Sequence, residues 1–303
     1  MKRRVVCAVA LAISASVSQA SAYCRTRTCQ NNLELCEYDG NGCMLSGKVL
    51  SRSSSCVSFN VQRDGSKRRG ISYDAAHASI AAAFERWLGA DCGNGLNPQL
   101  ELADLGAAVC HTAEYNQDSP NANVIIFRDS DWPYQNDIDT YALTTVKFDT
   151  VTGEIYDADV EVNTFESAMK IGNIGPKDID FESIITHEIG HFLGLSHSEE
   201  EGATMGGYYA LGDTSQASIE PDDVAGVCAA LAPDRMTTSA SCEPRHGFSA
   251  DCGDTAASDE PPSPHGGCQY TPSRPSPLQG MLCALLALGA IRLRRRRVAG
   301  SSN

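Results

Sequence analysis

Three of the seven histidines of this 303-residue chain lie in one short stretch, HEIGHFLGLSH, at positions 187–197. His187 and His191 are four residues apart, so a helix would place both side chains on one face, about one turn apart. Two imidazoles at this spacing can bind one Zn²⁺, and Gly194 lets the chain leave the helix so that His197 can supply a third nitrogen. Three nitrogen ligands leave one position of a tetrahedral zinc open, which is typical of a catalytic site.

Glu188 directly follows the first of these histidines on the same predicted helix. Zinc lowers the pKa of a bound water toward neutrality, so Glu188 is predicted to act as the general base and then to pass the proton to the leaving amine. The metal would polarise the scissile carbonyl. The alternative is a core helix that happens to contain histidines. Gly194 and His197 at fixed spacing lower the chance occurrence of HExxH by roughly several hundredfold, which favours the zinc site.

The elements that would hold this site can be read from periodicity. The stretch 181–195 is predicted to form the helix that carries the histidines, with Asp180 as N-cap and Gly194 as its C-terminal breaker. Apolar residues four apart predict another helix over 73–88, and a last helix is predicted over 219–231. Strands are predicted where apolar and polar side chains alternate or where an apolar run is bounded by polar residues, namely 56–62, 123–129 and the two arms of a hairpin within 142–164. The stretch 165–180 is expected to be a loop.

The histidine stretch resembles the HExxHxxGxxH pattern of metzincin zinc proteases. Ser198 after the third histidine, and Met205 at the end of GATM, resemble matrixins (peptidase M10 type) in particular, as do PDD-VAG at 221–226, AAFERW at 82–87 and DADVEVNT at 157–164. The resemblance covers about 56–232. It implies an α+β zincin fold with a twisted mixed sheet, an active-site helix and a Met-turn, in which Met205 forms an apolar floor beneath the metal. It further implies that substrate lies extended along an edge strand, here within 142–148.

Two features of matrixins are absent from the sequence. No histidine occurs within 112–186, so a second, structural zinc site built from His and Asp is not expected. The PRCGxPD cysteine motif of the propeptide is also missing, although a cysteine of the leader could serve a similar purpose.

Two groups of residues leave alternatives open. Asp157, Asp159 and Glu161 could bind Ca²⁺ or could form a solvated strand face. Tyr208 or Tyr209 could help to bind an oxyanion, or could serve ordinary packing.

The N-terminus predicts a secretory signal peptide over residues 1–22. A basic start is followed by an apolar run, roughly 5–17, and by the small-residue cleavage site Ala20-Ser21-Ala22. A membrane anchor is the alternative, but the run is short for a span. Export is therefore expected.

The cysteine count agrees with an exported protein. Of thirteen cysteines, one lies in the signal and two lie in the C-terminal tail, which leaves ten and predicts up to five disulfides. Residues 23–55 would form a Cys-rich, disulfide-stapled leader. Proximity in the sequence favours the pairs Cys92–Cys110 and Cys242–Cys252. A zinc ribbon is the competing interpretation, but the close CxxC pairs that it needs are absent.

The body between signal and tail is acidic. Three of the 24 basic residues lie in the signal and six follow Cys268, which leaves 15 against 38 acidic residues. Such a surface repels nucleic acid, and it suits solubility outside the cell. It also favours bound Ca²⁺, although a merely solvated acidic surface is the simpler interpretation.

The C-terminal part changes character. Residues 233–275 are rich in Pro, Ser and Gly and predict a disordered linker. Residues 276–303 contain the apolar run 278–291 and an arginine cluster, which predict a short anchor with the arginines inside. Together with Cys268 this tail resembles the C-terminal sorting signals of myxobacterial surface proteins, with a generic anchor as the alternative.

The sequence thus predicts a secreted or surface-anchored zinc endopeptidase, with His187, His191 and His197 as zinc ligands and Glu188 as base. It is expected to act as a monomer on protein or peptide substrates, with no nucleic-acid partner and with membrane contact only through the tail. One alternative is a non-catalytic adhesion or binding protein on a zinc-stabilised zincin scaffold, and another is a zinc hydrolase of small amides. Glu188 argues against the first, since a binding module does not need it.

Overall fold

The computed structural model describes residues 22–30, 35–134 and 140–251, and the backbone of residues 268–270. Residues 1–21 of the predicted signal peptide and the apolar, arginine-rich run at the C-terminus lie outside the described residues. Among the described residues, no helix is both long enough and apolar enough to cross a bilayer.

The helices of the described part form where the sequence predicts them. They are α1 (Tyr73–Leu88), α2 (Phe181–Phe192) and α3 (Pro221–Ala230), with a short 3₁₀ helix η1 (Ser215–Ala217). Helix α2 begins at Asp180, whose carboxylate accepts the N–H groups of Glu182 and Ser183. It ends earlier than the predicted residue 195, because Gly194 adopts φ +96°, a conformation that the helix cannot continue through.

A six-stranded mixed sheet forms the body of the domain, in the order β10-β5-β6-β4-β2-β3. Its strands are β2 (Cys56–Gln62), β3 (Glu101–Ala108), β4 (Val124–Phe127), β5 (Ala142–Phe148), β6 (Ile155–Val162) and β10 (Cys268–Tyr270). Strands β3, β2, β4 and β6 are parallel, whereas β5 and β10 are each antiparallel to their neighbours. Two small sheets join β1 (Cys24–Arg25) to β9 (Leu195–Ser196) and β7 (Met169–Lys170) to β8 (Ile179–Asp180).

The sequence analysis missed β3 and the pair β7–β8. Strand β3 lies at the edge of the sheet, most of its side chains are partly exposed, and Gly106 within it has φ +81°. An edge strand of this kind has no alternating apolar pattern to reveal it. Strands β7 and β8 have two residues each, which is too short for any periodicity, so the expected loop at 165–180 contains an unpredicted pair.

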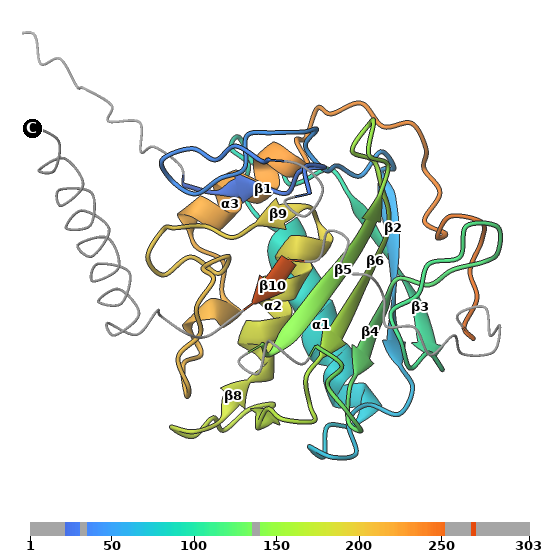
Figure 1. The fold of residues 1–303 in the computed structure, drawn as a ribbon, viewed down its shortest axis with the longest axis vertical. Helices are drawn as coiled ribbons and strands as arrows, with labels where there is room; N and C mark the ends of the chain where they lie inside the picture. The colour runs from blue at the N-terminus through green and yellow to red at the C-terminus, as the bar shows by residue number, and fades with distance from the viewer. Residues whose placement is uncertain (1–21, 31–34, 135–139, 252–267, 271–303) are drawn as a thin grey trace, which may run out of the picture.

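The main core lies between the sheet and the helices α1 and α2, which pack against one of its faces (Figure 1). Phe84 of α1 contacts Phe59 of β2 and Phe192 of α2, with ring centroids 5.0 and 5.2 Å apart. The indole N–H of Trp87 donates to the carbonyl of Thr186 over 2.7 Å. Helix α1 therefore fixes the position of the helix that carries the histidines.

The Cys-rich leader is part of this packing. Disulfides Cys24–Cys43 and Cys29–Cys36 staple it internally, and β1 pairs with β9 directly before His197. The Arg25 guanidinium donates to three backbone carbonyls, those of Gly194, Leu50 and Ala229. Leu50 is fully buried in the main core. The leader is thus docked on the segment that supplies the third histidine.

The two disulfides predicted from sequence proximity are wrong. Cys92, just after α1, pairs with Cys228 of α3, and Cys242 pairs with Cys56 at the start of β2. Cys110 is also disulfide-bonded. Pairing follows the folded arrangement, which brings the end of α1 to α3 and the C-terminal stretch to β2, and sequence separation carries no information about either.

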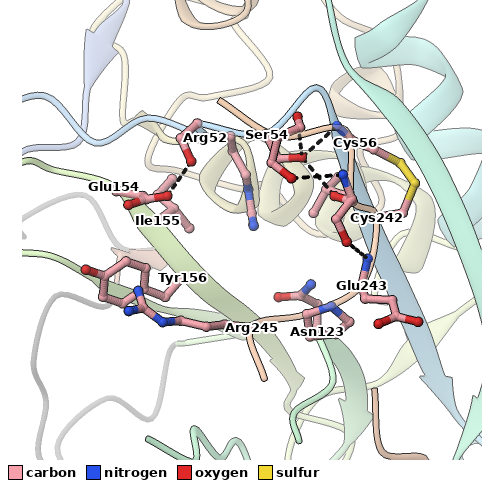
Figure 2. A pocket seen from close by; sticks show the side chains of 15 residues that line it. Arg52, Ser54, Cys56, Asn123, Glu154, Ile155, Tyr156, Cys242, Glu243 and Arg245 are labelled. Atoms are coloured by element: carbon pink, nitrogen blue, oxygen red, sulfur yellow. Dashed lines mark hydrogen bonds between the residues drawn. A yellow bond between two sulfur atoms is a disulfide. The ribbon is translucent and has the colours of Figure 1, made fainter. Parts of the chain in front are cut away.

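Residues 233–251, which were expected to be linker, are ordered on the domain. The Cys56–Cys242 disulfide holds them to β2, and the Arg235 guanidinium donates to the carbonyls of Arg52, Ser54 and Gln99. The disulfide and these hydrogen bonds hold the stretch on the domain, although it contains few apolar residues that could do so by burial. A cavity of about 380 Å³ lies between this stretch and the domain. Figure 2 shows the side chains that line it. None of the three clustered histidines lines it.

Candidate metal centre

The structure brings the three predicted histidines together. His187 and His191 are buried on α2, His197 is partly buried after β9, and one ring nitrogen of each lies within 4.8 Å of the others. The Nε2 atoms of His187 and His191 are 3.0 Å apart. Among the described residues, this is the one group in which three potential metal-ligand side chains converge.

Backbone carbonyls set the tautomers of two of these rings. Nδ1 of His187 lies 2.7 Å from the carbonyl oxygen of Thr204, and Nδ1 of His191 lies 3.0 Å from that of Leu195. A carbonyl only accepts, so each Nδ1 carries the proton and each Nε2 presents a lone pair to the centre. Two lone pairs at 3.0 Å repel each other, and a cation between them removes that repulsion.

The donor set fits zinc. Burial lowers the pKa of all three histidines, that of His197 to about 3, so the rings are neutral at physiological pH. Nε2 of His197 is buried and has no hydrogen-bond partner in the described part of the chain. Ligand atoms about 2.1 Å from a tetrahedral zinc lie about 3.4 Å apart. Here the Nε2 atoms of His187 and His191 are 3.0 Å apart, and the three ring nitrogens all lie within 4.8 Å of one another. Three neutral imidazoles of this kind are a nitrogen set that Zn²⁺ prefers.

Met205 lies directly beneath the ligand helix. It is almost fully buried, and a Cβ placed on Gly190 of α2 would be only 2.2 Å from its sulfur atom and 2.9 Å from Trp87. Gly190 therefore allows the Met205 turn to approach the helix between His187 and His191. The N–H of Ser198 donates to the Met205 carbonyl over 2.9 Å, which ties the turn to the segment that carries His197.

The buried carboxylate of Asp223 holds this turn in place. It accepts the N–H groups of Thr204, Met205 and Glu220 at 2.8, 3.0 and 2.9 Å. Burial raises its pKa, and these hydrogen bonds partly oppose that effect. The carbonyl of Thr204 accepts a hydrogen bond from Nδ1 of His187. Asp223, which holds the N–H of the same residue, therefore helps to position His187 through one residue of backbone. The sequence analysis included this residue only within a matched stretch, and no spacing revealed its role.

Glu188 is buried beside the histidines, where it contacts β5. The hydroxyl of Thr144 donates to its carboxylate, and also lies 3.2 Å from its backbone carbonyl. Thr144 thus links strand β5 to the predicted base. Sequence reasoning missed Thr144, because nothing in its own neighbourhood points to a residue 44 positions away.

The tyrosines after Met205 occupy structural or exposed positions. The hydroxyl of Tyr209 donates to the carbonyl of Asp213 over 2.6 Å and accepts the N–H of Asp180 over 2.8 Å. Burial raises its pKa to about 12. Tyr209 therefore supports the beginning of α2, while Tyr208 is exposed.

The acidic residues of β6 are buried, so one of the two alternatives for them, a solvated strand face, is wrong. Asp159 accepts the N–H groups of Glu114 and Val124, and Glu161 binds the guanidinium of Arg128. Burial raises the pKa of Asp157 to about 8, although the charge of Arg52 opposes this. This face of the sheet is covered because residues 233–251 and the segment before β4 pack over it.

Comparisons with known proteins agree with this geometry. Residues 98–230, somewhat less than half of the chain, match the matrixin family (peptidase M10). Metalloendoproteinase 1-MMP of Arabidopsis thaliana is 48% identical over 56 residues, which are 18% of this chain and 15% of the relative. Neutrophil collagenase of Homo sapiens is 36% identical over 74 residues, 22% of this chain and 16% of the relative. The chain thus matches only a small part of either relative.

Together with the mixed sheet and the three described helices, the family match shows the predicted α+β fold of the zincins and metzincins. The same comparisons support a matrixin-like zinc metalloendopeptidase in general terms.

Proposed function

We propose that this protein is an exported zinc-dependent endopeptidase that hydrolyses peptide bonds in protein or peptide substrates. The observation that carries the proposal is the arrangement of three converging, neutral imidazoles beside a buried glutamate. His187 and His191 are fixed by carbonyls so that both Nε2 lone pairs face the centre, and His197 adds a buried nitrogen without a partner.

In this proposal His187, His191 and His197 hold the zinc, which would supply Lewis acidity toward the scissile carbonyl and the attacking water. Glu188 takes a proton from the attacking water and returns it to the leaving amine. The Thr144 hydroxyl holds the carboxylate in one orientation. Met205 and Asp223 position the ligands and do not touch substrate.

Disulfides in the leader and in the domain support export, since such bonds persist in oxidising compartments. The signal-like N-terminus, at residues 1–22, supports the same location. Display on the cell surface through 276–303 remains part of the proposal. An extended substrate backbone would pair with β5, the strand that contacts Glu188 through Thr144.

The test is a cleavage assay on the zinc-loaded, signal-free chain, with casein and quenched peptides as substrates. Glu188→Ala is expected to abolish cleavage while metal analysis still finds one zinc per chain. Glu182→Gln, on the same helix but partly exposed and paired with Arg86, is the matched control and should cleave normally. Normal cleavage by Glu188→Ala would refute the mechanism.

The same assay separates the alternatives. A zinc-stabilised adhesion protein binds zinc but cleaves nothing, and a small-amide hydrolase cleaves short acyl amides but not casein. The ordered contact between Glu188 and Thr144 favours an enzyme over the adhesion protein, because a scaffold that only binds has no need to orient that carboxylate.

A further inference from the structure

The outer edge of β5 is paired with a short segment of the chain's own C-terminal part. Strand β10 runs antiparallel to β5, with Cys268 opposite Thr144, Gln269 opposite Leu143 and Tyr270 opposite Ala142. In Figure 1 this segment lies beside β5 and in front of α2. The backbone groups of β5 that an incoming strand would use are therefore already engaged.

The register places this pairing at the level of the proposed active site. Thr144, opposite Cys268, is the residue whose hydroxyl donates to Glu188. An extended substrate that paired with β5 beside Glu188 would need the same positions of the strand. The two segments cannot occupy them together.

The pairing is short enough to be displaced. Strand β10 pairs with β5 over three residues, whereas β6 pairs with the other edge of β5 over seven positions. Residues 252–267 separate β10 from Asp251 in the sequence. A tether of that length holds a weakly binding segment at an effective concentration on the order of millimolar. Such a segment competes with substrate without blocking the site permanently.

We propose that residues 268–270 act as an intramolecular competitor for the substrate strand, so that the intact chain is partly autoinhibited and loss of the tail raises its activity toward extended peptides. The inference rests on the proposed endopeptidase function. Its inhibition is competitive, since the backbone of β10 takes the place of substrate backbone. The expected effect is an apparent KM about two- to tenfold higher than in the released enzyme, with kcat unchanged.

The test uses the full signal-free chain and a backbone-directed double variant, Gln269→Pro with Tyr270→Pro. In an antiparallel pair, alternate residues point their N–H groups at the neighbour, so two adjacent prolines remove at least one such donor. The matched control is Gln269→Ala with Tyr270→Ala, which keeps both N–H groups. The proline pair is expected to lower KM two- to tenfold at constant kcat, and the alanine pair is expected to resemble the parent chain.

Hydrogen exchange at the β5 amides gives a second readout that does not need catalysis. The amides of Ala142 and Thr144, which face β10 rather than β6, should exchange faster in the proline pair than in the alanine pair. Unchanged KM and unchanged exchange in the proline pair would overturn this inference alone. Equal relief by the alanine pair, or by Cys268→Ser, would assign the inhibition to a side chain and overturn strand pairing. Absence of cleavage in every variant, with zinc bound, would instead overturn the proposed function.

Discussion

Replacement of Gly190 by alanine tests the packing beneath the three clustered histidines. In an ordinary helix, Gly→Ala stabilises by about 0.5–1 kcal/mol. Here the added Cβ would lie 2.2 Å from the Met205 sulfur and 2.9 Å from Trp87, in a fully packed region. Overpacking of this kind costs about 1–3 kcal/mol. The cost of overpacking exceeds the gain in helix propensity, so we expect Gly190→Ala to lower the free energy of unfolding by about 1–2 kcal/mol.

The assay is urea unfolding of the zinc-loaded chain, followed by tryptophan fluorescence, for Gly190→Ala, Met205→Ala and the double variant. With a slope of about 2 kcal/mol per molar urea, the expected loss for Gly190→Ala moves the midpoint down by about 0.5–1 M. Removing the Met205 side chain makes room for the new methyl group, so the double variant should be more stable than the two single losses predict. A Gly190→Ala protein as stable as the parent, or strictly additive losses, would refute the proposed contact.

Three further predictions follow from the site and the sheet. Thr144→Val removes the hydroxyl that orients Glu188 and should lower kcat about tenfold with zinc content and KM unchanged, measured by peptide cleavage. Asp223→Asn loses one acceptor for the turn that holds the Thr204 carbonyl against His187, and should weaken zinc binding about 10- to 100-fold in a chelator competition. The pKa of Asp157 is about 8 in the fold and near 3.8 when unfolded, so its contribution to stability is complete below pH 3.8 and is lost as pH rises to 8. Asp157→Asn should therefore flatten the fall of unfolding free energy between pH 5 and pH 8, by up to about 1.4 kcal/mol per pH unit.

Much of the secondary structure could be predicted because the local pattern of apolar and polar residues agrees with the structure that the segment adopts. Helix α1 and strand β2 begin and end at the predicted residues, since one shows apolar residues at helical spacing and the other strict alternation. Strand β3 could not be predicted, because an exposed edge strand needs no apolar pattern. The ordered conformation of residues 233–251 was not predicted, for a different reason. It depends on a disulfide and on the guanidinium of Arg235, which composition does not reveal.

The residues of the candidate site likewise fall into those that the sequence pattern reveals and those that only the fold reveals. The three histidines and Glu188 could be found because they share one helix and the turn after it, where spacing fixes geometry. Thr144 and Asp223 could not, because they reach the site only through the pairing of strands and the docking of α3. Residues that hold the histidines and Glu188 in place come from distant parts of the chain, and only the folded arrangement identifies them.

The sequence positions of the paired cysteines affect how the disulfides can form while the chain is being exported. Two of them join cysteines only 19 and 7 residues apart in the leader, whereas the bonds from Cys56 and Cys92 reach 186 and 136 residues ahead. A chain exported N-terminus first exposes Cys56 and Cys92 to the leader cysteines long before Cys228 and Cys242 arrive. Early wrong pairs must then be exchanged, which takes seconds to hours and is accelerated by an isomerase. The rate at which this protein matures is therefore expected to depend on thiol exchange in the compartment that receives it.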